Sequence, residues 1–286
     1  MHALRAVAFA FTLACAGLAC GAGKEAPPSV TPAVSTGAPK VELGAWHPTS
    51  FGTYLAPKEA FLDDRGGFDL LFEFNAGMMA ESDMRVLGAK VVYLCMANLG
   101  MGTTPYWDMF TDPSHFASLL AETTRSIQKM TNRKDAHVGR LGLVAWSAGY
   151  AAVQQILVVP SYYDEIGAVV LLDGLHTGYV KRPDGTPTKE PELRTLAPFV
   201  RFAEDAAAGK KVFVFTHTAI IPPDYASTTE VAAALARRLG AVPDGDALSR
   251  GDFHVLAHGG GAAKDHVDNL HLIDDVLSRW VLPRWK

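Results

Sequence analysis

Residues 141–150, LGLVAWSAGY, decide the fold of this chain. An apolar, strand-like run leads to Ser147, and a helix-like stretch, 150–158, follows it. A serine between small residues at a strand-to-helix junction is typical of a nucleophile elbow, a sharp turn that presents a hydroxyl at the end of a sheet. The small residues here are Ala145 and Gly149, where the usual pattern has glycine at both positions. The alternative interpretation is an ordinary strand–helix turn built from small residues.

Apolar strand-like runs alternate with helical stretches from residue 41 to the C-terminus. Buried strands separated by helices imply parallel pairing with helices on both faces. The sequence therefore predicts an α/β fold: a doubly wound, mostly parallel sheet flanked by helices, in a single domain. The expected strands are 68–74, 90–96, 140–145, 168–173, 211–216 and 251–257, and the expected helices are 112–130, 150–158, 199–208, 227–239 and 268–281.

The overall composition suits a globular protein and excludes some partners. The chain has 286 residues, of which 49% are hydrophobic and 20% charged, with a net charge of −4. Nothing in this charge suggests a nucleic-acid partner held by electrostatic attraction, so we expect none. No phosphate-cradling glycine motif is present, so we expect no nucleotide and no other cofactor.

The N-terminus has the features of an export signal. Arg5 precedes an apolar run that ends in small residues, and Cys20 follows directly. This arrangement resembles a bacterial lipoprotein box, in which the cysteine receives lipid and becomes the mature N-terminus. Cys15 is a poorer candidate for that role, and secretion without lipid is the alternative.

The resulting organisation is a signal peptide over 1–19, a flexible tether over 20–40 and a catalytic domain over 41–286. The tether is rich in Ala, Pro, Ser, Thr and Gly, so it has too few large apolar residues to form a core. The domain would face the periplasm or the cell surface from a membrane anchor. Cys95 is then the one cysteine in the domain, and its apolar surroundings predict a buried, unreactive thiol.

A serine nucleophile needs a base, and the base should follow the last strand of the sheet. His266 comes after a flexible glycine run and before the final predicted helix, so we expect it to reach the elbow. His271, one turn into that helix, and His258 are the alternatives. His254 lies inside a predicted strand, which indicates a structural role.

The acid that orients the base is expected at a strand end as well. Asp173 directly follows the apolar strand 168–172, and Gly174 comes next. The strand after it, 211–216, has no carboxylate in its following loop until Asp224, which is the alternative acid. Asp173 could also simply cap the turn that follows it.

Backbone N–H groups must stabilise the oxyanion. The N–H of Ala148, directly after the nucleophile, is one expected donor. The second is expected from the turn after the first buried strand, where we assign the N–H of Gly77, with Met78 next in line. A simple β-turn is the alternative for this segment.

Two further segments follow strand ends and could shape a pocket. The loop 98–110 carries Tyr106, Trp107 and Phe110, which could line an acyl pocket or belong to a lid or to the core. A long polar insertion, 181–192, follows the candidate acid in a place where insertions often cover a site.

From about Phe68 to the C-terminus the chain resembles the α/β-hydrolase superfamily. The motifs that carry the resemblance are AWSAG at the elbow, LLDG at the acid-bearing strand end and DHVDNL in the histidine segment. The resemblance implies a serine hydrolase that cleaves an ester or related acyl bond of a small-molecule or lipid-like substrate through an acyl-enzyme. Ala145 and the acid's position depart from the commonest pattern.

Two other functions stay open at this point. One is a catalytically inactive, ligand-binding lipoprotein with a hydrolase fold. The other is a metal-dependent enzyme, because His254 and His258 are four residues apart with Asp265, His266 and Asp268 close by. The four-residue spacing suits a metal on a helix and not on a strand, so we expect no metal.

Overall fold

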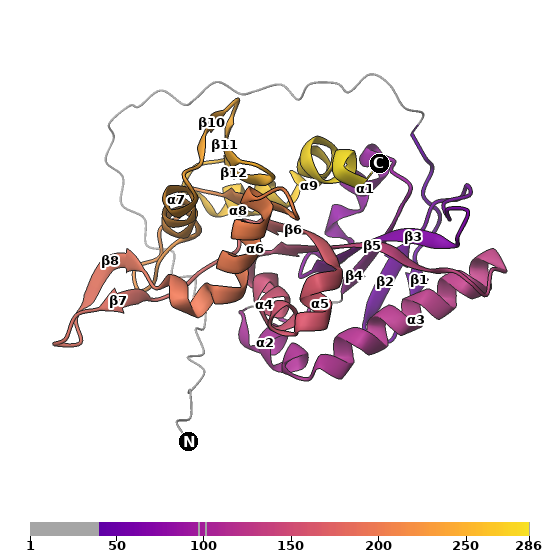
Figure 1. The fold of residues 1–286 in the computed structure, drawn as a ribbon, viewed down its shortest axis with the longest axis horizontal. Coiled ribbons are helices and arrows are strands. Elements are labelled where there is room, and N and C mark those ends of the chain that lie inside the picture. Colours follow the sequence, from indigo (N-terminus) through magenta and orange to yellow (C-terminus); the bar gives the residue numbers. More distant parts are fainter. Residues whose placement is uncertain (1–39, 97, 101, 286) are drawn as a thin grey trace.

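The computed structural model describes residues 40–96, 98–100 and 102–285 (Figure 1). The predicted signal peptide, Cys20 and almost all of the predicted tether lie outside these residues. In the described part, ten strands form one sheet in the order β1-β2-β4-β3-β5-β6-β9-β12-β11-β10. The strands of this sheet are β1 His47–Pro48, β2 Gly52–Leu55, β3 Gly67–Phe74, β4 Val91–Met96, β5 His137–Trp146, β6 Ile166–Leu172, β9 Val212–His217, β10 Val242–Asp244, β11 Ala247–Arg250 and β12 Phe253–Ala257.

Helices connect most of the central strands. The α-helices are α1 Glu81–Leu87, α2 Thr104–Thr111, α3 Pro113–Thr131, α4 Tyr150–Val158, α5 Pro160–Glu165, α6 Ala197–Ala207, α7 Thr228–Leu239, α8 Ala263–Leu270 and α9 Ile273–Val276. Short 3₁₀-helices are η1 Gly77–Ala80, η2 Ser147–Gly149, η3 Leu193–Leu196 and η5 Leu282–Trp285, and η4 Leu277–Val281 is a π-helical turn. No described helix is both long and apolar enough to cross a bilayer.

The six central strands, β4-β3-β5-β6-β9-β12, run parallel to one another. They correspond to the six strands expected from the sequence, and the predicted doubly wound α/β class is confirmed. The antiparallel strands at the two edges, β1, β2, β10 and β11, were not anticipated. They are two to four residues long, which is too short for a clear hydrophobic pattern.

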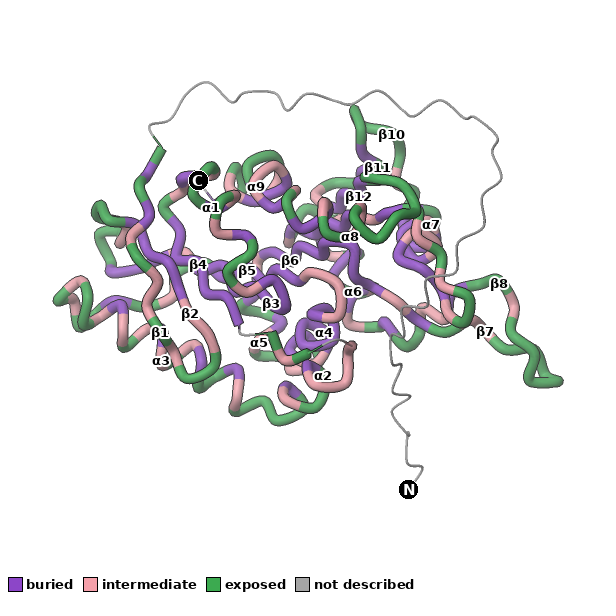
Figure 2. The backbone as a smooth tube through the Cα atoms, turned by 180° about the vertical axis from the view of Figure 1, so that it is seen from behind, coloured by how far each residue is buried: buried purple, intermediate pink, exposed green. Residues whose placement is uncertain are grey.

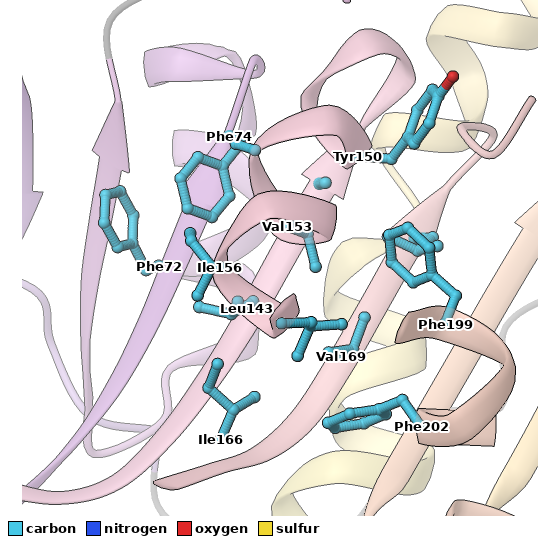
Figure 3. Close-up of a cluster of buried hydrophobic side chains, with 14 of the residues drawn as sticks. Phe72, Phe74, Leu143, Tyr150, Val153, Ile156, Ile166, Val169, Phe199 and Phe202 are labelled. Atoms are coloured by element: carbon cyan, nitrogen blue, oxygen red, sulfur yellow. The ribbon is translucent and has the colours of Figure 1, made fainter. Parts of the chain in front are cut away.

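Both faces of the sheet are covered, which explains why its central strands are almost continuously apolar. One face packs against α2, α3, α4, α6 and α7, and the other packs against α1, α8, α9 and η4. Figure 2 shows the buried central strands surrounded by more exposed outer segments. On the first face, Phe72 from β3, Ile156 from α4 and Phe202 from α6 belong to one buried cluster between the sheet and the helices (Figure 3). Each such side chain contributes about 1.5–3 kcal/mol on burial.

The insertion after β6 forms a two-stranded hairpin of β7 Tyr179–Lys181 and β8 Pro187–Pro191. The hairpin projects from the body of the molecule beside α7 (Figure 1). It is joined to the start of α7 by the bridge between Thr177 and Ala226.

The sheet order reverses between β3 and β5, and this reversal fixes where a ligand can bind. From β3 the chain moves outward to β4, then crosses to the other side and continues through β5, β6, β9 and β12. Connections leave β3 and β5 on opposite faces at such a point, which leaves a crevice at the carboxyl ends of the strands. The segments that follow β3 and β5 are the turn 75–77 and the elbow serine.

Candidate active site

The predicted elbow is present at the end of β5. Ser147 follows the strand directly, is partly exposed, and has a φ of +53°, a left-handed conformation that is strained for a residue with a side chain. Gly149 lies so close to β3 that a Cβ there would be 2.3 Å from the carbonyl oxygen of Phe74. Ala145 is fully buried between β3 and β6, and the structure accommodates its methyl group. The strained serine and the obligatory glycine are the physical features of a nucleophile elbow.

A second tight turn packs directly against the elbow. Asp173, after β6, also has a left-handed φ, of +45°. A Cβ on the next residue, Gly174, would lie 2.1 Å from the backbone oxygen of Ser147, so only glycine fits there. The backbone of the acid-bearing turn therefore contacts the backbone of the nucleophile turn, and neither can move independently.

Asp173 is held in a cradle of hydroxyl and N–H donors. It is 2% exposed, and its Oδ1 accepts from the backbone N–H of Thr218 at 2.9 Å and from the hydroxyl of Thr228 at 3.0 Å. The Thr218 hydroxyl donates to Oδ2 at 3.0 Å. Burial acts to raise the pKa of Asp173, but the bonds from His266, Thr218 and Thr228 outweigh it and the pKa is lowered. The group is therefore a carboxylate at neutral pH.

His266 reaches this carboxylate. Its Nδ1 lies 2.6 Å from Asp173 Oδ2. An ionised carboxylate only accepts hydrogen bonds, so the Nδ1–H of His266 is the donor and Nε2 is left as an acceptor. This is the tautomer that a general base needs in order to take a proton from a hydroxyl.

The sequence misplaced the element that carries this histidine. It was expected in a loop before a helix over 268–281, but His266 lies in α8, which begins at Ala263. The helix starts early because the Asp265 carboxylate accepts the Ala262 backbone N–H at 2.9 Å and caps the first turn. The expected single final helix is divided among α8, α9, η4 and η5.

Trp146, the residue before the elbow serine, contacts His266 in two ways. The indole and imidazole rings are stacked with centroids 5.0 Å apart and an interplanar angle of 29°. The indole Nε1–H also donates to the backbone oxygen of His266 at 2.9 Å. Trp146 therefore joins the end of β5 to α8.

The alternative acid and bases lie elsewhere. Asp224 is exposed. His258 is exposed as well, and His271 Nδ1 is paired with Asp83 Oδ2 at 2.7 Å. His254, expected to be structural, is bonded to Ser249 at 2.8 Å and stacked on Trp280. The structure thus brings Asp173 and His266 together beside the elbow. Asp224, His254, His258 and His271 do not take part in this pair.

The turn after β3 is fixed from two sides. Asn75, with a φ of +88°, donates from Nδ2 to the backbone oxygen of Trp146 at 3.1 Å and accepts from the Tyr106 hydroxyl at 2.5 Å. Below the turn, the buried Glu73 carboxyl accepts the N–H of Ala76 at 2.6 Å and the N–H of Gly77 at 3.1 Å. The N–H that the sequence assigned to the oxyanion is therefore engaged with Glu73, and the assignment of Gly77 stays a prediction.

Aromatic side chains after β4 divide between the core and the surface. The segment expected as a loop contains α2, in which Tyr106 and Phe110 are fully buried and Trp107 is exposed. Tyr106 and Phe110 are therefore core residues and not part of an open acyl pocket. Cys95, on β4, is buried as predicted, and burial raises the pKa of its thiol to about 11.

The start of the insertion after Asp173 forms a second aromatic group. The His176 ring packs edge-on against Tyr150 at 6.1 Å and Tyr225 at 5.2 Å between centroids. The Tyr150 hydroxyl donates to the His176 backbone oxygen at 3.2 Å. Burial lowers the pKa of His176 to about 4, so its ring is neutral at physiological pH.

Several residues of the site had no signal in the sequence that singled them out. Thr218 and Thr228 hold Asp173 from the end of β9 and the start of α7, 45 and 55 residues away in the chain. Glu73 reads as one polar position in an apolar strand. One clue could have identified Thr218: it follows the end of a strand, and ligands of parallel sheets bind at the carboxyl ends of the strands.

Within the described residues no three His, Cys, Asp or Glu side chains lie close enough to hold a metal ion together. Of the residues named for the metal-dependent alternative, His254 is bonded to Ser249 and His266 to Asp173.

No family model and no curated protein sequence matches this chain. Solved structures with a similar fold include an uncharacterised protein from Capnocytophaga ochracea, at 12% identity and a TM-score of 0.45, with 81% of this chain and 63% of that one aligned. The enterobactin esterase FES from Shigella flexneri is similar at 11% identity and a TM-score of 0.46, over 84% of this chain and 60% of that one. An S-formylglutathione hydrolase from Agrobacterium tumefaciens is similar at 11% identity and a TM-score of 0.41, over 83% and 97%. This chain thus spans less than two thirds of the first two proteins, and similarity at this level assigns it no activity.

Proposed function

We propose that this protein is a serine hydrolase that cleaves an ester or related acyl bond through an acyl-enzyme. The observation that carries the proposal is the Asp173–His266 hydrogen bond of 2.6 Å beside a serine held at a φ of +53°. Strained backbone is kept where the surrounding structure enforces it, and it gathers at reactive sites. A buried carboxylate, an oriented imidazole and a strained serine at one sheet edge are the parts that acyl transfer requires.

In the proposed mechanism, Ser147 Oγ attacks the carbonyl carbon of the substrate while His266 Nε2 takes the hydroxyl proton. The negative charge on the carbonyl oxygen is stabilised by the N–H of Ala148 and by a donor from the turn after β3. We assign this second donor to Met78, because the N–H of Gly77 is bonded to Glu73 and could serve only if that bond broke. His266 then returns the proton to the leaving alcohol, which departs as the acyl-enzyme forms. Water repeats the sequence with His266 as base, releases the acid and restores Ser147.

Hydrolysis of a panel of p-nitrophenyl esters tests this proposal. Ser147→Ala and His266→Ala should each lower kcat by about 10³-fold or more. The matched control is Ser249→Ala, because Ser249 also hydrogen-bonds a histidine, His254, but has neither a left-handed φ nor an acid behind the imidazole. Equal activity of Ser147→Ala and wild type would overturn the proposal.

The second candidate function is an inactive ligand-binding protein with the same fold. The observation in its favour is the bond between Gly77 N–H and Glu73, which occupies an expected oxyanion donor. It predicts a folded protein that hydrolyses no ester in the panel and is unaffected by Ser147→Ala.

We further propose that the protein is exported in a bacterium and anchored to the membrane by lipid on Cys20. The support is the sequence pattern of residues 1–20, a basic start, an apolar run and small residues before the cysteine. The domain would then act on small-molecule or lipid-like esters in the cell envelope.

A further inference from the structure

Glu73 is the one carboxyl group of the described residues that is both fully buried in the sheet and without a role in the proposed triad. It is 0% exposed and lies one residue before the end of β3. Its neighbours across the sheet are Cys95 on β4 and Val144 on β5, which belong to the apolar layer facing α1 and α9. No Lys or Arg in the described part of the chain forms a salt bridge with it.

This location is costly for a carboxyl group. Burial raises the pKa of Glu73 to about 8, although the two hydrogen bonds it accepts act to lower that pKa. An apolar residue of similar size would avoid the cost of desolvation. A group that lowers stability in this way and stands next to a candidate site needs a function that an apolar residue cannot perform.

The two hydrogen bonds identify that function. Glu73 Oε1 accepts from Ala76 N and Oε2 accepts from Gly77 N, so the two oxygens hold two consecutive amides of the turn after β3. Asn75 holds the same turn from the other side through Trp146 O. Within the turn itself the one polar side chain is Asn75, which is bonded to Trp146 O and to the Tyr106 hydroxyl and not to the amides of Ala76 and Gly77.

We propose that Glu73 is a positioning residue that fixes the oxyanion turn, and that its two loop bonds set the orientation of the second oxyanion donor relative to Ser147. This inference rests on the proposed function. By holding the N–H groups of Ala76 and Gly77 in place, Glu73 defines the direction of the amide of Met78, at the start of η1. Misplacing such a donor affects the transition state more than substrate binding, because the oxygen carries full charge only in the transition state.

The test is the Glu73→Gln variant, assayed by steady-state ester hydrolysis and by the rate of phosphonylation with a fluorophosphonate. Glutamine has one acceptor oxygen, and its NH₂ group would face the second loop N–H, so one bond is lost without a change in size. We expect kcat and the phosphonylation rate to fall by roughly 10- to 100-fold while KM changes by less than about 3-fold. Glu73→Asp keeps the carboxyl group but is too short to reach both amides. It should show the same fall in kcat with little change in KM if the glutamine variant fails to fold.

Cys95→Ala is the matched control, because Cys95 lies opposite Glu73 in the same buried layer and its thiol is paired with the Thr53 hydroxyl. It should keep kcat within about 3-fold of wild type. If Cys95→Ala lowers kcat as much as Glu73→Gln, Glu73 acts only through general packing and the inference is wrong. A wild type that reacts with the fluorophosphonate, with an unchanged rate in Glu73→Gln, also overturns the inference and leaves the proposed function intact. A wild type that neither reacts nor hydrolyses esters overturns the proposed function and this inference with it.

Discussion

The indole of Trp146 is stacked on the imidazole of His266 at 5.0 Å and hydrogen-bonded to the backbone oxygen of the same residue. Trp146 is the last residue of β5, so His266, the proposed base, is held by the residue that precedes Ser147, the proposed nucleophile. The stack limits rotation of the imidazole, and the hydrogen bond limits sliding of α8 across the sheet edge. Together with the bond to Asp173, these contacts place the histidine ring from three directions.

Removing the indole should therefore impair the base without removing any triad member. We expect Trp146→Leu, which loses both contacts, to lower kcat/KM by about 10- to 100-fold. Trp146→Phe keeps a ring but loses the N–H bond and should show a smaller loss. Ester hydrolysis kinetics measure both effects. Trp280→Phe is the control, since Trp280 stacks on His254 in the same manner away from the site, and it should leave kcat/KM unchanged. Equal activity of Trp146→Leu and wild type would show that the stack has no part in placing His266.

The contact between the two tight turns predicts a strict requirement for glycine at position 174. A methyl group there would lie 2.1 Å from the Ser147 oxygen, so Gly174→Ala must displace either the elbow or the acid-bearing turn. We expect a loss of about 2–4 kcal/mol in the free energy of unfolding and a loss of ester hydrolysis. Gly178→Ala, four residues later in a position with open space around it, should be neutral in both measurements. A Gly174→Ala variant with wild-type stability and activity would contradict the described geometry.

Asp173 should be the acid, and Asp224 should not. Because hydrogen bonds from His266 and two threonines lower its pKa despite burial, Asp173 is ionised at neutral pH and holds the Nδ1–H tautomer of His266. Asp173→Asn replaces one acceptor oxygen by an NH₂ donor and should reduce kcat by about 10³- to 10⁴-fold. Asp224→Asn, a change at an exposed residue, should leave kcat unchanged. Loss of activity in Asp224→Asn, with full activity in Asp173→Asn, would show that Asp224, in the loop after β9, is the acid.

The sequence predicted the sheet and the principal candidates because both depend on local patterns. The six central strands are continuous apolar runs, and Ser147, Asp173 and His266 each follow a recognisable strand end or precede a helix. Asp173, singled out because it directly ends an apolar strand, lies beside His266 in the structure, and its role as the acid stays a prediction. Contacts that form only in the folded protein could not be predicted from the sequence. Thr218 and Thr228 become partners of Asp173 only through folding, and Glu73 meets the Gly77 N–H only once β3 ends in a left-handed Asn75.

The early start of α8 also depends on a contact that the sequence pattern did not reveal. Glycines 259–261 indicated a loop, and the capping bond from Asp265 back to Ala262 shifted the helix toward them. His266 consequently approaches the elbow from a helix that Trp146 holds in place, and not from a mobile loop.

Glu73 should make the stability of the protein fall with pH over a defined range. Its pKa is about 8 in the folded protein, raised by burial from an ordinary value of 4.5. Below about pH 4.5 the group is protonated in both the folded and the unfolded states, so it costs nothing. Between about 4.5 and 8 only the unfolded state releases the proton, so the free energy of unfolding should fall by up to about 1.4 kcal/mol per pH unit.

Urea denaturation at pH 5, 6, 7 and 8 measures this effect. The stability of wild type relative to Glu73→Gln should decline steadily over the series, because the glutamine does not titrate. Cys95→Ala keeps the carboxyl and should follow the wild-type slope. A difference between wild type and Glu73→Gln that stays constant with pH would show that the buried carboxyl does not titrate in this range.

The proposed lipid anchor can be tested separately from catalysis. In a bacterial host, Cys20→Ser should abolish metabolic labelling with palmitate and release the protein from the membrane fraction. Cys15→Ser, which alters the poorer candidate, should leave labelling and fractionation unchanged. Labelling that persists in Cys20→Ser and disappears in Cys15→Ser would assign the lipid to Cys15. A wild-type protein that takes up no palmitate would favour secretion without lipid.

The activation of Ser147 by His266 is tested most directly by mapping the site of fluorophosphonate modification with peptide mass spectrometry. We predict a single adduct on Ser147 in wild type and in Ser249→Ala, a rate of adduct formation at least about 10³-fold lower in His266→Ala, and no adduct in Ser147→Ala. Folded wild-type protein that forms no adduct, or an adduct on a residue other than Ser147, would contradict the account.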